Sequence, residues 1–213
     1  MPLLKRRHFN LLGLSLWAQG LWTSHAFAQD RTLLVVGDSL SAEYGLPRGS
    51  GWIALLEEQL RQDKSPWKII NASISGDTTA GGRSRLPALL KQHQPSVVVI
   101  ELGGNDALRG FSMAMTEDNL QVMVKASQAI NAKVLLIGMQ VPPNYGADYA
   151  AQFSQLFVRL AKQHKTAVVP FMLKGIADAA NTTEMFQADR IHPTAQAHPR
   201  ILANIWPELK KLL

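Results

Sequence analysis

Five short apolar runs alternate along this chain with five longer segments of helical pattern, and this alternation limits the possible folds more than any other feature. The apolar runs cover residues 32–37, 67–72, 97–102, 133–139 and 166–170. The helical segments cover residues 51–62, 79–92, 116–130, 148–164 and 194–212. Runs that are apolar at nearly every position are typical of parallel strands covered on both faces. The order therefore predicts an α/β fold with right-handed βαβ units and a doubly wound parallel sheet.

Residues able to do chemistry follow the predicted strands directly. In an open parallel sheet, the active site lies beyond the carboxyl ends of the strands. Polar segments at residues 38–39, 75–77 and 104–106 follow the first three strands, and Asp189 and His192 come after the fifth. We therefore expect the functional site at this edge of the sheet.

Composition excludes several classes of protein and of site. With 213 residues, 46% of them hydrophobic and 18% charged, the chain has the balance and length of one globular domain. It contains no cysteine, which excludes disulfides, a thiolate nucleophile and Cys-ligated metal centres. The formal net charge is +6, but no Lys/Arg stripe is interleaved with aromatic residues, so no nucleic-acid partner is predicted.

The start of the chain predicts a secretory signal peptide. Three basic residues at positions 5–7 precede a mostly apolar stretch at 9–22, and small residues suit an A-x-A cleavage site at 26–28. Cleavage after Ala28 leaves residues 29–213 as a single domain of net charge +3, periplasmic or secreted. An uncleaved anchor is the alternative, although the apolar stretch is shorter than the ~20 residues of a spanning helix. The paired arginines also resemble a twin-arginine motif, so the export route stays open.

Ser39 is the candidate nucleophile. It lies in Gly37-Asp38-Ser39-Leu40, where the first predicted strand turns towards a helix. A serine hydroxyl attacks only when a base takes its proton, and a helix start favours developing negative charge at such a position. The alternative is an ordinary helix N-cap, for which Asp and Ser are favoured residues.

Asp189 and His192 provide the base that Ser39 requires. A carboxylate three residues before a histidine can accept the Nδ1 proton across one turn, which leaves Nε2 free to take the serine proton. Pro193 suits the first position of the closing helix. His198 is a rival base, but it lies inside the helical pattern and has no carboxylate at a comparable spacing.

Two further residues are candidates for binding the oxyanion of a tetrahedral intermediate. Gly76 offers a backbone N–H without a side chain to obstruct approach, and Asn105 offers a side-chain amide. The alternatives are a turn glycine with positive φ for Gly76 and an Asx-turn for Asn105.

Taken together, these segments resemble the four ordered blocks of the SGNH/GDSL hydrolase family. The blocks are residues 37–40, Gly76, residues 103–106 and residues 189–192. The similarity extends from about Thr32 to the end of the chain and is strongest to bacterial thioesterase/lysophospholipase enzymes often described as arylesterases. It implies a three-layer α/β/α sandwich, flavodoxin-like, with five parallel strands in the order 2-1-3-4-5.

The resemblance also implies the role of each site residue. Ser39 is the nucleophile, and Asp189 and His192 complete a triad. The Ser39 N–H, the Gly76 N–H and the Asn105 side chain form the oxyanion hole. No metal is expected, because no Asp/His cluster has ligand spacing and the triad needs none; no nucleotide cofactor is implied, because no phosphate-binding glycine fingerprint occurs.

Four polar residues beside the catalytic positions are interpreted as structural. Asp38 and Asp106 are expected to cap helix starts or to hold loops, and Asn71 and Asp77 are expected to brace the site through loop hydrogen bonds.

Two apolar segments, residues 108–115 and 139–149, flank the predicted site, and they either line an acyl groove or form loop core. Their candidate groove residues are Leu108, Phe111, Met113, Pro142, Pro143 and Tyr145. The function predicted is a serine acyl hydrolase acting on esters, acyl thioesters and lysophospholipids, with at most transient contact to a membrane surface. The alternatives are a carbohydrate deacetylase on the same triad and a non-catalytic acyl-ligand binding protein. Nothing in the sequence requires more than a monomer.

Overall fold

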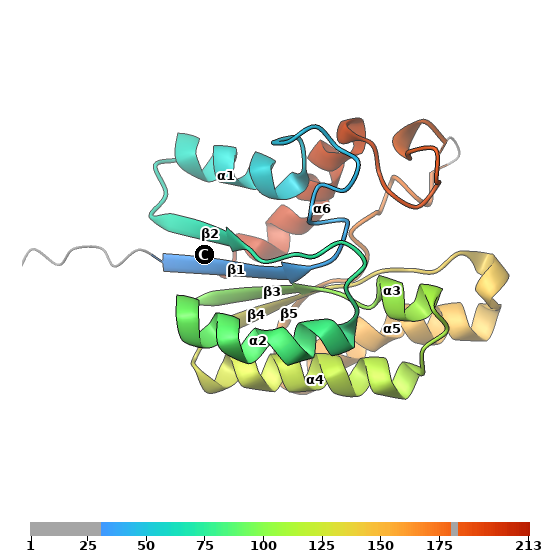
Figure 1. Cartoon of the computed structure of the whole chain (residues 1–213), viewed down its shortest axis with the longest axis horizontal. Helices are drawn as coiled ribbons and strands as arrows, with labels where there is room; N and C mark the ends of the chain where they lie inside the picture. The colour runs from blue at the N-terminus through green and yellow to red at the C-terminus, as the bar shows by residue number, and fades with distance from the viewer. Residues whose placement is uncertain (1–30, 180–182) are drawn as a thin grey trace, which may run out of the picture.

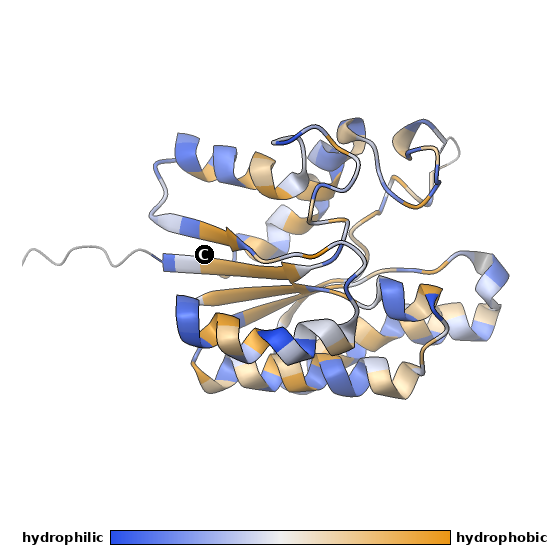
Figure 2. Ribbon diagram, in the orientation of Figure 1, coloured by the Kyte–Doolittle hydropathy of each residue, from blue (hydrophilic) through white to orange (hydrophobic). Residues whose placement is uncertain are grey.

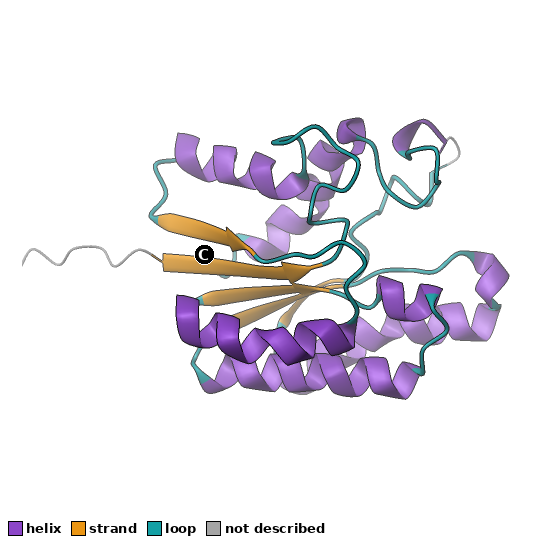
Figure 3. Ribbon diagram, in the orientation of Figure 1, coloured by secondary structure: helices purple, strands orange, loops and turns teal. Residues whose placement is uncertain are grey.

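A single five-stranded sheet forms the centre of the computed structural model, which describes residues 31–179 and 183–213. The strands are β1 (Arg31–Gly37), β2 (Trp67–Asn71), β3 (Val97–Glu101), β4 (Lys133–Ile137) and β5 (Ala167–Val169). They lie in the order β2-β1-β3-β4-β5, and every neighbouring pair is parallel (Figures 1 and 3). The predicted strand order is therefore confirmed. The predicted signal peptide lies outside the described residues.

Helices cover both faces of the sheet. They are α1 (Trp52–Gln62), α2 (Thr79–His93), α3 (Gly104–Leu108), α4 (Met113–Ala129), α5 (Ala147–His164) and α6 (His198–Leu209). Figure 1 shows α1 and α6 on one face, with α2, α4 and α5 on the other. This is the expected three-layer sandwich. Within the described residues, no helix is both long and apolar enough to cross a membrane.

The core consists of two apolar layers separated by the sheet. Because side chains alternate across a strand, Leu33 and Val35 of β1 pack with α1 and α6, whereas Leu34 and Val36 pack with the helices of the opposite face. Both layers need apolar partners, so β1 beyond its polar start and most of β3 are apolar at successive positions, and Figure 2 shows these parts in orange. All five residues of β3 are buried.

The largest differences between the observed and the predicted helices are at α3, at the start of α4 and in the closing helix, which also ends at Leu209 rather than at residue 212. The five-residue α3 was not predicted, because periodicity cannot be recognised over little more than one turn. Helix α4 begins at Met113 rather than at residue 116, so Met113 packs against the core and does not lie in a loop. The closing helix begins at His198 rather than at residue 194, after a 3₁₀ turn at Ala195–Ala197.

Candidate active site

Ser39 lies in a run of tight turns directly after β1. The N–H of Ala42 donates to the carbonyl of Asp38 at 3.0 Å. The helix expected to start at Ser39 is absent, and α1 begins only at Trp52. Gly45 has a positive φ of 68°, which a regular helix cannot contain, so the turns do not continue into one. Turn geometry rather than a helix terminus therefore presents the Ser39 hydroxyl.

Close packing explains the glycine two positions before Ser39. A Cβ atom at Gly37 would lie 2.7 Å from Oε2 of Glu101 and 2.9 Å from the side chain of Ser41. Such distances are below ordinary van der Waals contact, so only glycine lets the Ser39 turn rest on the end of β3.

Asp189 and His192 lie in a narrow loop that doubles back before α6. Phe186 and Pro193 form an isolated antiparallel bridge, and the N–H of Gln187 donates to the carbonyl of His192 at 2.8 Å. The expectation that Pro193 starts the closing helix is therefore wrong, because this bridge holds its backbone extended. Pro199 instead occupies the first turn of α6.

The three candidate catalytic side chains form one continuous chain of contacts. Nε2 of His192 lies 2.8 Å from Oγ of Ser39, and Nδ1 of His192 lies 2.6 Å from Oδ2 of Asp189. The other carboxylate oxygen of Asp189 accepts the backbone N–H of Ile191 at 2.9 Å and that of His192 at 3.0 Å. The loop thus brings together residues that stand 153 positions apart in the sequence.

The electrostatics of this loop favour an ionised Asp189. Partial burial raises the pKa of its carboxyl, but hydrogen bonds from the backbone and side chain of His192 and from the Ile191 N–H outweigh this and hold the pKa at about 2. An ionised carboxylate can only accept, so it holds the Nδ1–H tautomer of His192 and turns the Nε2 lone pair towards Ser39.

The three candidate oxyanion donors belong to different segments of the chain, and Ser39 and Asn105 line the same cavity. Within the described residues, neither the Ser39 N–H nor the Gly76 N–H donates a hydrogen bond. Gly76 has a positive φ of 76°, and its carbonyl accepts from Nη2 of Arg109 at 2.7 Å. Nδ2 of Asn105, in α3, donates to Oδ2 of Asp38 at 2.9 Å, and this amide nitrogen carries a second hydrogen.

An apolar cavity of about 320 Å³ opens over Ser39 and His192. Besides the catalytic segments, its lining residues are Leu40, Leu108, Met139, Gln140, Val141, Pro142, Leu173, Ala177, Phe186, Arg190 and Ile191. The sequence analysis did not predict the lining residues that come after β5, which are Leu173, Ala177, Phe186, Arg190 and Ile191.

Of the six candidate groove residues, Leu108 and Pro142 line this cavity, whereas Met113 packs against the core. Phe111 and Tyr145 do not line the cavity: the Phe111 N–H closes the turn after α3 by donating to the carbonyl of Asp106, and Tyr145 stacks on Tyr149. The side chain of Pro143 lies outside the described part of the structure.

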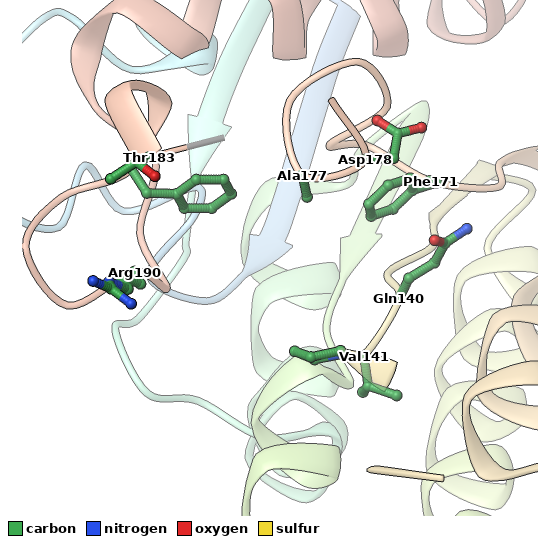
Figure 4. Close-up of a pocket in the computed structure, with 9 residues that line it drawn as sticks. Gln140, Val141, Phe171, Ala177, Asp178, Thr183 and Arg190 are labelled. Atoms are coloured by element: carbon green, nitrogen blue, oxygen red, sulfur yellow. The ribbon is translucent and has the colours of Figure 1, made fainter. Parts of the chain in front are cut away.

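A second cavity, of about 540 Å³, adjoins the first and shares Gln140, Val141, Pro142, Ala177, Phe186 and Arg190 with it. Phe171 and Asp178 also line this second cavity, as Figure 4 shows, and both belong to the segment after β5. Among the described residues, no group of three or more His, Asp or Glu residues is placed to hold a metal ion.

Comparison with known proteins shows the family of this chain. Residues 35–200 match the GDSL-like Lipase/Acylhydrolase family. This chain belongs to that family.

Three relatives of this GDSL hydrolase indicate its chemistry. Esterase TesA of Pseudomonas aeruginosa is 52% identical over 91% of this chain and 94% of its own length. Thioesterase 1/protease 1/lysophospholipase L1 of Escherichia coli is 42% identical over 91% of this chain and 89% of its own. The crystal structure of the psychrotrophic esterase EstA from Pseudoalteromonas, inhibited by monoethylphosphonate, is 40% identical, has a TM-score of 0.79 and covers 85% of this chain and 98% of its own. The protein is accordingly a carboxylic ester hydrolase with the expected SGNH fold.

Two neighbours of the GDSL hydrolase site were not found from the sequence. The ring of Tyr44 packs against the ring of His192, with 4.4 Å between their centroids. Nε2 of Gln187 donates to the carbonyls of Tyr44 and Pro193 at 2.9 and 3.0 Å, which ties the His192 loop to the Ser39 turns. Both contacts join segments that are distant in sequence, so no local pattern reveals them.

His198, the rival base, has a structural position. It is buried, and its Nδ1 accepts the backbone N–H of Trp52 at 2.9 Å at the start of α1. Burial lowers the pKa of His198, partly opposed by the charge of Glu43, and this favours the neutral ring that can accept this bond. It therefore caps a helix, and the ring nitrogen that contacts the Ser39 hydroxyl belongs to His192.

The polar residues interpreted as structural make the expected kinds of contact. Asp106 accepts the backbone N–H of Thr79 at 2.9 Å and also bonds the Thr79 hydroxyl, at the start of α2. Asp77 pairs with Arg85 at 2.8 Å. Nδ2 of Asn71 donates to the carbonyl of Ser41 at 2.9 Å, which braces the Ser39 turns against β2.

Two buried carboxyl groups lie beneath the Ser39 turns. Oε2 of Glu101 accepts the Ser41 hydroxyl at 2.8 Å and the Asp38 N–H at 3.2 Å. Burial, and then the nearby charge of Asp38, raise the pKa of Glu101 well above its usual value. Burial also raises the pKa of Asp38 to about 6, against hydrogen bonds from the Leu40 N–H and Asn105 and the charge of His192.

Replacing Glu101 by Gln is expected to make the fold less sensitive to alkaline pH. A carboxyl whose pKa is raised on folding contributes stability below its unfolded pKa of 4.5, and this stability is lost as the pH rises. Over the pH range in which Glu101 is protonated in the folded state and ionised in the unfolded state, this contribution to the free energy of unfolding falls by about 1.4 kcal/mol per pH unit in the wild type. Urea unfolding of wild type and Glu101→Gln from pH 5 to 9 measures the difference. A difference that is the same at every pH would contradict the buried neutral acid.

Proposed function

We propose that this protein is a serine acyl hydrolase that cleaves carboxylic esters and acyl thioesters through a covalent acyl-enzyme. Ser39 is the nucleophile, His192 the general base and acid, and Asp189 the residue that orients His192. The observation that carries the proposal is the unbroken chain of contacts from Asp189 through His192 to the Ser39 hydroxyl, at 2.6 and 2.8 Å, beside an apolar cavity.

In the first step, Oγ of Ser39 attacks the carbonyl carbon while its proton passes to Nε2 of His192. The carbonyl π electrons move to oxygen, and the resulting oxyanion receives hydrogen bonds from the Ser39 N–H, the Gly76 N–H and the Asn105 amide. His192 then protonates the leaving oxygen or sulfur as the bond to the carbonyl carbon breaks, and the acyl group stays on Ser39.

The second step is hydrolysis of the acyl-enzyme. His192 takes a proton from water, whose oxygen attacks the acyl carbon, and the same three donors hold the second oxyanion. Collapse of this intermediate returns the proton to Oγ of Ser39 and releases the carboxylic acid. Asp189 stays ionised throughout and stabilises the imidazolium formed in each step.

The substrate class follows from the cavity and from the relatives. The lining of the cavity is largely apolar and includes Leu108, Met139 and Phe186, which suits an acyl chain longer than acetyl. Relatives named esterase and thioesterase/lysophospholipase act at oxygen and sulfur esters. We extend both activities, and lysophospholipid hydrolysis, to this protein.

We further propose that the protein acts outside the cytoplasm as a single domain of residues 29–213, after a signal peptide is cleaved behind Ala28. Lysophospholipids or exogenous esters are then more accessible substrates than cytoplasmic acyl-CoA. A monomer in transient contact with a membrane surface is sufficient for this activity.

A chain-length series tests the substrate class directly. We expect the mature chain to hydrolyse p-nitrophenyl esters of medium or long acyl chains faster than the acetyl ester, measured as kcat/KM from acetyl to palmitoyl, because the longer chains bury more apolar surface in the cavity. A sharp preference for acetyl would favour the carbohydrate deacetylase instead. Binding of acyl chains without any turnover would support the other alternative, a non-catalytic acyl-ligand binding protein.

A further inference from the structure

The Asn105 amide can help an oxyanion in only one of its two orientations. Its Nδ2 donates hydrogen bonds and its Oδ1 only accepts them, although the two ends have nearly the same shape. If the amide rotated by half a turn, Oδ1 would face the bound carbonyl oxygen and repel the developing negative charge. Some other group must therefore select the orientation that places Nδ2 beside the substrate.

Asp38 is placed to make this selection. Its carboxylate is buried, with 3% of the residue exposed, and Oδ1 is held by the Leu40 N–H at 3.0 Å. The remaining oxygen, Oδ2, accepts from Nδ2 of Asn105 at 2.9 Å. An ionised carboxylate cannot donate, so it accepts only the nitrogen end of the amide. The second hydrogen of Nδ2 then stays available for the substrate.

The surroundings of Asp38 determine when its carboxylate is ionised. Glu101 approaches from β3 and Asp77 from the loop after β2, while His192 approaches from the loop before α6. Arg85 of α2 is paired with Asp77 and contributes its charge there. Glu101 is the more deeply buried of the two neighbouring acids, and its pKa lies well above its usual value because of burial and the charge of Asp38. Of Glu101 and Asp38, it is therefore Asp38 that carries the negative charge.

We propose that Asp38 is a positioning residue of the oxyanion hole, whose ionised carboxylate selects the orientation of Asn105 in which Nδ2 faces the substrate carbonyl. This inference rests on the proposed function, because it concerns the same acyl-transfer site. It gives the residue before the nucleophile a role in catalysis beyond capping the turn.

A double-mutant cycle separates positioning from simple support. The Asp38→Asn variant keeps the shape and keeps an oxygen for the Leu40 N–H, but it presents an NH₂ group to Asn105 and so favours the reversed amide. We expect Asp38→Asn and Asn105→Ala each to lower kcat by about a hundredfold to a thousandfold with KM nearly unchanged. The double variant is expected to be no slower than Asp38→Asn alone, because both changes remove the same donor.

Asn71→Ala is the matched control. Asn71 also braces the Ser39 turns, through the Ser41 carbonyl, but it has no hydrogen bond to Asn105. Its loss of activity should therefore multiply with that of Asn105→Ala. The proposal would be overturned if the losses of Asp38→Asn and Asn105→Ala also multiplied in the double variant. It would likewise be overturned if Asp38→Asn kept a kcat above a tenth of that of the wild type. A wild type that turns over no ester would instead overturn the proposed function itself.

The acid limb of the pH profile tests the same point without altering Asp38. In the wild type, protonation of Asp38 should lower kcat as the pH falls, and this adds about one to the slope of log kcat on the acid limb. In Asn105→Ala, the state of Asp38 no longer affects a donor, so we expect the acid limb to lack this added slope. Equal slopes in the two proteins would show that Asp38 does not act through Asn105 and would overturn the proposal.

Discussion

Ser39→Ala is expected to lower kcat for p-nitrophenyl esters by at least roughly a thousandfold, because it removes the only atom proposed to bond the acyl group. The proposed oxyanion donors and the cavity remain in this variant, so KM should change little. Steady-state kinetics of the mature chain on the preferred acyl ester gives both constants.

Covalent labelling provides the control for this variant. The related esterase EstA was crystallised inhibited by monoethylphosphonate, and an activated ethylphosphonate should add one phosphonyl group to the wild type and none to Ser39→Ala in intact-mass spectra. Ser75→Ala, at an exposed serine on the neighbouring loop, should keep both the label and the activity. Full activity or full labelling of Ser39→Ala would place the nucleophile elsewhere.

Asp189→Asn is expected to lower kcat by roughly a thousandfold to ten-thousandfold through the wrong tautomer of His192. The amide oxygen of Asn can still accept the Ile191 and His192 backbone N–H groups, so the loop keeps its shape. Its NH₂ group, however, would face Nδ1 and favour a ring protonated at Nε2, which cannot take the Ser39 proton. The measurement is kcat for the same ester at pH 8.

The pH dependence of Asp189→Asn distinguishes this cause from a loosened loop. Because the pKa of Asp189 is held at about 2, its carboxylate is ionised throughout an assay between pH 5 and 9. The loss of activity should therefore be similar at every pH in that range, and the melting temperature at pH 8 should fall only modestly. Activity above a tenth of wild type would show that Asp189 does not set the state of His192.

Much of the fold could be predicted because it depends on local patterns. The apolar runs at residues 97–102 and 133–139 became β3 and β4, since a strand covered on both faces must be apolar at consecutive positions. The strand order followed from resemblance rather than from periodicity. The pattern failed at α3, which is too short to show a period, and at Pro193, whose backbone pairs with Phe186 instead of starting a helix.

Within the site, the sequence by itself determined which chemical groups are available. Residue type, position after a strand and resemblance to family blocks predicted Ser39, Asp189, His192, Gly76 and Asn105 as site residues. The three-residue spacing of Asp189 and His192 also predicted their contact, because one turn of chain spans that distance.

Only the tertiary structure decided how distant groups meet and how their proton affinities change. The packing of Tyr44 on His192, the pairing of Asp38 with Asn105 and the placement of Phe186 at the cavity all join segments far apart in the chain. Burial of Glu101 beneath the Ser39 turns likewise depends on how β1 and β3 pack. Such contacts, and the desolvation that shifts a pKa, arise from the whole path of the backbone, whereas local residue patterns specify only single elements.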